Sequence, residues 1–267
     1  MFLEDYYPLS SHYVSGAKKI TIRSFLPKIV NGNLQLQYEK TKGNFDLYFN
    51  IEGLLIQSEH LANFKEGKTI YSYNAKKKLV RAELLHKVTN EIKFQSEFTY
   101  DTKGRIKTER CYTFLFKECS GLSQLNHTYS CNLEIINEST NPDDDYGSVI
   151  IITHDETQKT IETRSIESYK KRVNWYKKVF DKKDQLLRKY VFDEFGQTTS
   201  IIEYKPNNEK GATPSYIRFS AHKDIIKDDI FQYDEKGNWI SQLVTLNGEP
   251  YNYHERTIEY FHLTLFD

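Results

Sequence analysis

The side chains that could perform metal or nucleophilic chemistry do not fall into any known catalytic spacing. The eight histidines include no pair at the i, i+4 spacing of a zinc protease and no His-x-His strand pattern. No Gly-x-Ser-x-Gly elbow or glycine-rich phosphate loop occurs either. We therefore assign no catalytic residue, no metal and no cofactor to this chain. The histidines are His12, His60, His86, His127, His154, His222, His254 and His262.

Three consecutive aspartates, Asp143 to Asp145, form the densest carboxylate group. A calcium loop spaces its oxygen ligands at alternate positions and ends in a distal glutamate, so this run indicates a solvated loop. We do not expect an enzyme. The alternative from that class is a hydrolase with its site near residues 143–155.

The densest basic stretch covers residues 168–189 and contains Trp175 and Tyr176 among lysines. A basic groove with stacking rings would suit single-stranded nucleic acid. Lysine alternating with rings is also typical of an ordinary strand whose edge is protected from aggregation. The whole chain has 37 basic and 37 acidic residues, so no overall field attracts nucleic acid, and we expect no nucleic-acid partner.

Aromatic rings make up 14% of the chain and are its most distinctive feature. Rings favour pleated, half-buried surfaces, and rings on an exposed sheet face can stack on sugars or peptides. Trp239, Tyr251 and Tyr253 lie near one expected hairpin and, with Trp175 and Tyr176, are the candidate ligand-binding residues. The alternative is that these rings are cross-strand packing pairs.

Cysteine use and the N-terminal sequence bear on the cellular compartment. Cys111, Cys119 and Cys131 are odd in number and fit no zinc-binding spacing, so we expect reduced structural thiols. The N-terminus shows no basic segment followed by an apolar one, and no apolar run is long enough to span a membrane. We expect a cytoplasmic protein, or an exported one if a signal segment has been removed.

The elements that must position these residues are hairpins built on one repeated unit. The unit is an aromatic residue, then Asp or Asn, then two or three polar residues often ending in Gly, then an alternating strand. Each unit predicts an antiparallel strand–turn–strand. The spacing of the units is irregular, which indicates a meander of unequal hairpins. The turns begin at Asn50, Asn74, Asp101, Asp181, Asp193 and Asp234.

The last of these units is the clearest. Residues 230–233, 239–246 and 251–261 are expected strands, joined by a turn at 234–238 and by Asn247-Gly248, a strong hairpin signal. Indications of helix are confined to a turn or two at 58–64 and 221–229.

Two copies of the unit, YDTKGR at 100–105 and YDEKGN at 233–238, resemble the YD-repeat, or Rhs-like repeat, β-proteins of bacteria. The resemblance implies strand–turn–strand units of an extended sheet, which in giant members coils into a shell around a toxin. This chain is too short for such a shell and has no Asp-Pro self-cleavage signature. The resemblance is therefore to short, non-toxin members, and it implies a fold more than an activity.

We thus predict an all-β protein, an extended and twisted antiparallel meander in two halves or in one continuous domain. The expected parts are an N-terminal sheet at 1–120, a connecting insert at 121–163 and a C-terminal sheet at 164–267. The predicted function is a non-catalytic module that presents a sheet face and edges to a protein or glycan partner. A structural protein that self-associates through strand edges is a further alternative.

Overall fold

The structure is a computed structural model that describes residues 14–39, 44–60, 67–115, 118–139, 148–167, 172–205, 216–220 and 224–261. Within these ranges the chain forms one sheet of 19 strands. The strands are β1 (Ala17–Val30), β2 (Asn33–Tyr38), β3 (Phe45–Phe49), β4 (Leu55–His60), β5 (Gly67–Tyr73), β6 (Leu79–His86), β7 (Ile92–Tyr100), β8 (Ile106–Leu115), β9 (Glu118–Ser130), β10 (Leu133–Ser139), β11 (Ser148–Asp155), β12 (Thr160–Glu167), β13 (Arg172–Phe180), β14 (Leu186–Phe192), β15 (Thr198–Tyr204), β16 (Tyr216–Ser220), β17 (Ile225–Tyr233), β18 (Trp239–Leu246) and β19 (Glu249–Tyr260).

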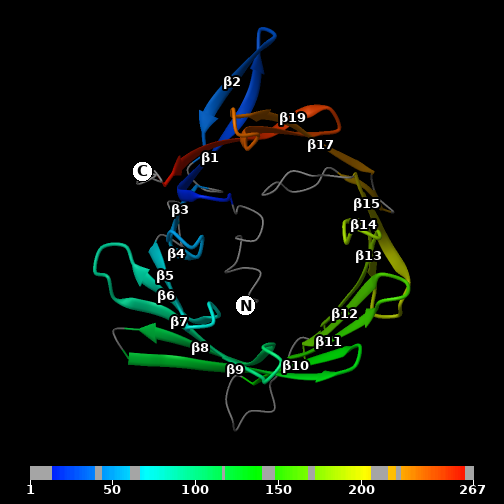
Figure 1. The fold of residues 1–267 in the computed structure, drawn as a ribbon. Coiled ribbons are helices and arrows are strands. Elements are labelled where there is room, and N and C mark those ends of the chain that lie inside the picture. Colours follow the sequence, from blue (N-terminus) through cyan, green and yellow to red (C-terminus); the bar gives the residue numbers. More distant parts are fainter. Residues whose placement is uncertain are drawn as a thin grey trace, which may run out of the picture.

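The sheet closes on itself through its first strand. From β3 to β19 each strand is antiparallel to the one before it, and β1 pairs with both β3 and β19. Ile20 thus lies opposite Leu47 on one side and Ile258 on the other. The result is a closed barrel, which Figure 1 shows as a ring of strands. Among the described strands β2 pairs with β1 alone, and it stands outside the ring.

The predicted all-β antiparallel class is confirmed, and closure is the feature that the predicted meander lacked. The short helical turns are wrong where the structure describes them, since 58–60 belong to β4 and 225–229 to β17; 61–64 and 221–223 lie outside the described residues. The division at 120 and 163 stays a prediction, because a continuous ladder does not show where folding units begin and end.

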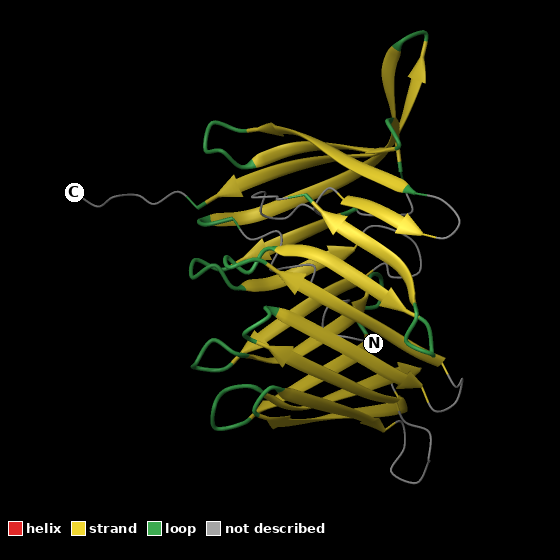
Figure 2. Cartoon of the chain, turned by 90° about the vertical axis from the view of Figure 1, so that its right-hand side faces the viewer, coloured by secondary structure: helices red, strands yellow, loops and turns green. Residues whose placement is uncertain are grey.

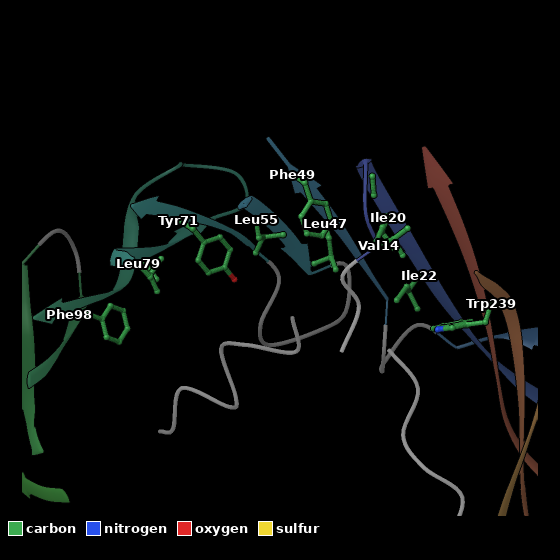
Figure 3. Packing of buried hydrophobic residues seen from close by; sticks show 12 residues of the cluster. Val14, Ile20, Ile22, Leu47, Phe49, Leu55, Tyr71, Leu79, Phe98 and Trp239 are labelled. Carbon is green, nitrogen blue, oxygen red and sulfur yellow. The ribbon is translucent and has the colours of Figure 1, made fainter. Parts of the chain in front are cut away.

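Alternation along the strands separates an inner face from an outer face. The main apolar cluster comes from β1, β3, β4, β5, β6, β7 and β18, and Figure 3 shows its side chains on the concave side of the wall. Ile20 and Leu47 are fully buried there, and Phe98 and Trp239 mark its two ends. A smaller cluster of Leu125, Ile136 and Ile150 continues it onto β9, β10 and β11.

The six predicted turns share one geometry. In each, the side-chain oxygen of the Asp or Asn accepts the N–H of the residue four positions on, at 2.8–3.0 Å. The residue three positions on has a positive φ, which favours glycine. The aromatic residue before each Asp or Asn marks a register shift in the ladder. The positive-φ residues are Gly53, Lys77, Gly104, Asp184, Gly196 and Gly237.

These turns gather mostly at one end of the barrel. The turn at Asp193 follows β14, whereas the other five follow strands that run in the opposite direction. In Figure 2 the short loops accordingly line up along one side of the wall. The sequence repeat therefore builds one rim of the barrel.

Tyrosine hydroxyls tie this rim together. Three inward-facing tyrosines each donate to the carbonyl of the first residue of the preceding strand. Such bonds satisfy a carbonyl where the ladder begins and hold neighbouring hairpins at a fixed height. The pairs are Tyr73 with Leu55 at 2.8 Å, Tyr100 with Leu79 at 2.6 Å, and Tyr129 with Ile106 at 2.9 Å.

Substitution at the positive-φ position tests the shared turn geometry. Gly237 has a φ of 75° and nothing within 4 Å of an added Cβ, so Gly237→Ala introduces backbone strain alone. We expect the free energy of unfolding to fall by about 1–2 kcal/mol. Urea unfolding followed by the fluorescence of buried Trp239 measures this change.

The matched variant is Lys77→Gly, at the same turn position with a φ of 58°. Glycine relieves the backbone strain of the folded state but raises the conformational entropy of the unfolded chain. We therefore expect the free energy of unfolding to rise by about 0.5–1 kcal/mol. A loss of stability in Lys77→Gly, or none in Gly237→Ala, would show that these turns are not equivalent.

Candidate functional site

The five sequence-predicted ligand-binding residues do not form one site. Trp239 is 2% exposed on the inner face, where the Arg256 guanidinium lies 4.6 Å from its ring. Tyr251 is exposed on β19, and Tyr253, two residues on, lies half-buried against Phe25. Tyr251 and Tyr253 therefore share a surface, and Trp239 is covered.

Trp175 and Tyr176 are consecutive on β13 and point to opposite faces. The Trp175 ring packs on Phe192 at 5.0 Å and donates its Nε1–H to Glu162 at 2.8 Å. The Lys189 ammonium lies 4.4 Å from the centroid of the Tyr176 ring. These contacts agree with cross-strand packing, while a ligand-binding role for the five residues stays a prediction.

A polar cluster on the inner wall contains several titratable groups with shifted pKa values. Glu109, only 2% exposed, lies between Phe98 and Leu125 in the ladder and accepts the Cys111 thiol at 3.3 Å. Burial raises the pKa of Glu109 above its usual range. Burial raises the pKa of Cys111 to about 11; the hydrogen bond with Ser96 opposes this rise, and neighbouring Glu109 adds to it. Cys111 is thus held as a thiol, which is a poor nucleophile.

His127 and Glu134 form a hydrogen bond beside that group, with Nδ1 2.9 Å from Oε1. The hydrogen bond from His127 lowers the pKa of Glu134. His127 Nε2 is buried, and no described residue forms a hydrogen bond with it. Among the described residues, no group of three potential ligands could hold a metal ion.

A second polar cluster joins β1 to β17, β18 and β19. The Lys227 ammonium lies 2.6 Å from Asp229, which also accepts the Gln242 amide at 2.8 Å. Ser24 is fully buried with its hydroxyl 2.9 Å from His254 Nδ1, so no substrate can reach that hydroxyl. Burial, and then the charge of Lys227, lower the pKa of His254. This cluster therefore serves to hold strands together.

The region suggested for a hydrolase is only partly described. Residues 140–147 lie outside the described ranges, and 148–155 form β11. Asp155 accepts the N–H groups of Thr157 and Gln158 at 3.0 Å and so acts as a turn residue. A pocket of about 180 Å³ at this rim is lined by residues that include His154, Lys159 and Asp184. Lys159 is paired with Asp184 at 3.2 Å.

The outer wall is covered in several places by cross-strand ion pairs. Asp46 lies 3.0 Å from Lys19 and 2.7 Å from Arg23. Burial opposes ionisation of Asp46, but the hydrogen bonds from these cations lower its pKa. Arg188 similarly pairs with Glu203 at 2.7 Å. Such pairs keep an exposed sheet face soluble.

One band of the outer wall is apolar instead. Tyr38, Phe25, Tyr253, Leu243 and Ile230 lie opposite one another on β2, β1, β19, β18 and β17, and we call them the outer apolar row. The first three are rings in edge-to-face contact, with centroids 5.8 Å and 6.0 Å apart. Ile230 is 59% exposed at the far end. Large exposed apolar patches are, in proteins generally, common locations of interaction surfaces.

The β1–β2 hairpin, residues 26–38, extends that row beyond the barrel. Asn31 and Gly32 both have positive φ and make the tight turn. Figures 1 and 2 show the hairpin standing away from the wall. Leu34 and Leu36 on β2, and Ile29 opposite Leu34 on β1, are all exposed.

The two edges of this hairpin differ. The Glu39 N–H donates to Ser24 O at 2.9 Å, which fixes the alternation of ladder bonds. The backbone groups of Leu34, Leu36 and Tyr38 therefore point away from β1, and in the described part of the chain no strand covers them. Beyond the barrel, the outward positions on the β1 side are Pro27, which has no N–H, and Ile29, with Lys28 between them. Proline and lysine are the usual protection of a strand edge, so in the described part of the chain the β2 edge is the less protected of the two.

The sequence-based prediction of binding residues missed this hairpin. Its signals were the Asn31-Gly32 turn and the uncharged alternation NLQLQY at 33–38. Among the residues that the structure describes, no helix has the length and apolar character needed to cross a membrane.

Comparisons with known proteins give only distant structural similarity. No protein family and no curated protein matches the sequence. A porin-like protein from Bacteroides vulgatus ATCC 8482 is 11% identical with a TM-score of 0.40, over 92% of this chain and 99% of that one. A porin-like protein from Bacteroides uniformis ATCC 8492 is 11% identical with a TM-score of 0.32, over 94% of this chain and 100% of that one.

A third similar structure is that of TcdB2-TccC3-Cdc42. It is 10% identical with a TM-score of 0.32, over 85% of this chain and 14% of that one. At these scores no property of any of the three proteins transfers to this chain.

Two carboxylates of the inner wall, Glu109 and Glu134, should affect the free energy of unfolding in opposite directions. A raised folded-state pKa means that folded Glu109 holds its proton more tightly, so its contribution weakens as pH rises through and above the usual glutamate pKa of about 4.3. We expect Glu109→Gln to raise the free energy of unfolding at pH 7 and to remove that part of the pH dependence. Urea unfolding between pH 4 and pH 8, roughly the range around that pKa, measures it.

Glu134→Gln is the matched control with the opposite sign. Because the pKa of Glu134 is lowered, its stabilisation is present at neutral pH and is lost as pH falls through that lowered value. The variant should therefore be less stable than wild type at pH 7, and the difference should vanish in acid. Equal effects of the two substitutions would contradict this assignment of the pair.

The three thiols should differ in reactivity. Cys119 and Cys131 are exposed, whereas Cys111 has a raised pKa of about 11. With an aromatic disulfide reagent at pH 8, we expect rapid labelling of Cys119 and Cys131 and slow labelling of Cys111, whose thiolate fraction is about a thousandth. The Cys119→Ser/Cys131→Ser variant isolates the slow phase, and fast labelling of that variant would contradict the burial of Cys111.

Proposed function

We propose that this chain is a non-catalytic protein-interaction module that binds an extended segment of a protein partner along β2. The observation that carries the proposal is the open, uncharged edge of β2 on a sheet that is otherwise closed. Strand addition at an edge uses backbone hydrogen bonds for affinity and alternate side chains for specificity. A partner strand placed there would meet the N–H and C=O groups of Leu34, Leu36 and Tyr38.

The asymmetry of the hairpin supports this role. An exposed apolar edge strand is an aggregation hazard unless it has a use. Pro27 and Lys28 block the β1 edge, while β2 has neither proline nor charge. Protection on one edge alone favours a controlled docking site.

The ring contacts favour a peptide over a glycan. Sugar binding by stacking needs an aromatic face open to solvent. Phe25 contacts Tyr38 on one side and Tyr253 on the other, edge to face. The outer apolar row therefore offers an apolar strip that suits alternate side chains of a bound strand.

We also propose that the hairpins of this chain are related to the repeats of short, non-toxin YD-repeat proteins. Its support is the common geometry of the six turns, in which Asp or Asn caps the turn and a positive-φ residue follows. The variants Gly237→Ala and Lys77→Gly test whether the turns share this geometry.

The test is binding of a fluorescent, capped peptide with the sequence of Asn33–Tyr38. We expect saturable binding to the wild-type protein, measured by fluorescence anisotropy. Leu36→Lys should weaken it about tenfold or more, because burying a leucine contributes about 1.5–3 kcal/mol and a charged edge repels an added strand. The same peptide with proline at its central leucine should not bind, since proline lacks the donor.

Ile166→Lys is the matched control on the protein. Ile166 is 37% exposed against 39% for Leu36, but it lies on β12 between β11 and β13. It should leave peptide binding unchanged. Equal binding of both peptides, or an equal loss in both protein variants, would overturn strand addition at β2.

A further inference from the structure

The sequence of β2 is complementary to itself. Its six residues, NLQLQY, place Leu34, Leu36 and Tyr38 on one face and Asn33, Gln35 and Gln37 on the other. Only an antiparallel partner that keeps apolar residues opposite apolar residues extends both faces without mismatch. A second β2 satisfies this condition.

We propose that the strand bound at β2 is β2 of a second copy of this chain, related by a two-fold axis at Leu36. This inference rests on the proposed function and names its partner. The axis places Leu36 opposite the partner's Leu36 and Leu34 opposite the partner's Tyr38. These residues carry the outward backbone groups, so each such pair exchanges ladder hydrogen bonds.

The other face fits equally well. In this register Gln35 lies opposite the partner's Gln37, and a glutamine amide both donates and accepts hydrogen bonds. A slip of one residue would place leucines opposite glutamines and lose both arrangements. The two-fold register about Leu36 pairs Leu34 to Tyr38 of one copy with the same residues of the other.

Charge presents no obstacle to this pairing. β2 contains no ionisable carboxylate or amine, and the chain as a whole has a net charge of 0. Two copies therefore approach without the repulsion that a charged edge would impose. A partner of unrelated sequence would need to supply the same alternation, whereas a second copy has it already.

The geometry also limits the assembly to two copies. A two-fold interface is isologous, so it uses the same β2 edge of both chains. In the dimer each β2 edge is therefore covered by the other copy. The opposite edge of the hairpin is blocked by Pro27 and guarded by Lys28. The pairing therefore closes as a dimer and does not continue as a fibre.

Sedimentation or light scattering across a wide range of concentrations tests the dimer. We expect the mass to rise from 31.6 kDa to twice that value with increasing concentration. Leu36→Lys should remain a monomer throughout, and Ile166→Lys should follow the wild type. A wild type that stays monomeric, or a dimer that persists in Leu36→Lys, overturns the proposal.

Cross-linking tests the register, in a Cys119→Ser/Cys131→Ser background. Gln35 and the partner's Gln37 form a non-hydrogen-bonded pair, with Cα atoms about 4.5 Å apart, within the range of a disulfide. A mixture of Gln35→Cys and Gln37→Cys proteins should form disulfide dimers under mild oxidation. Each variant alone should not, and equal cross-linking of Gln35→Cys alone would overturn the axis at Leu36.

The two proposals can fail separately. If wild type stays monomeric while the Asn33–Tyr38 peptide binds in a Leu36-dependent way, the second copy is excluded and strand addition stands. If neither a dimer nor peptide binding is found, both proposals are overturned.

Discussion

The double pairing of β1 is the constraint on which the rest of this structure depends. Its first half is hydrogen-bonded to β3 on one side and to β19 on the other, and this closes the sheet. Closure removes the edges that an open sheet of the same strands would expose. It also forces the second half of β1 out of the ring, where β2 is its one strand partner among the described residues. The barrel and its protruding hairpin are therefore two results of one strand.

Much of the local structure could be predicted from the sequence, because it depends on neighbours in the chain. Asp101 and Asp234 lie in turns with the same hydrogen bonds, as the aromatic–acid–glycine pattern predicts. The pairing of β1 with β19 could not be predicted in this way. Alternation states which residues share a face, but it contains no information on curvature or on which distant strand completes the sheet.

The site was less predictable than the fold, for a related reason. Ring-rich segments attracted the prediction of ligand-binding residues, yet Trp239 owes its position to the inner core. Whether a ring is covered depends on which face the closed sheet turns inward. The exposed hairpin had its own signal in Asn31-Gly32, but its place outside the ring formed by the other described strands follows only from closure.

The contact between Ile20 and Ile258 has a kinetic consequence, since these residues lie almost at opposite ends of the chain. The ring cannot be completed until β19 has been synthesised and has left the ribosome. Until then β1 and β18 each present an unsatisfied ladder, and the entropy of joining so long a loop slows the final step. Nascent chains of this protein thus pass through an open, adhesive sheet until β19 has been synthesised and has paired with β1.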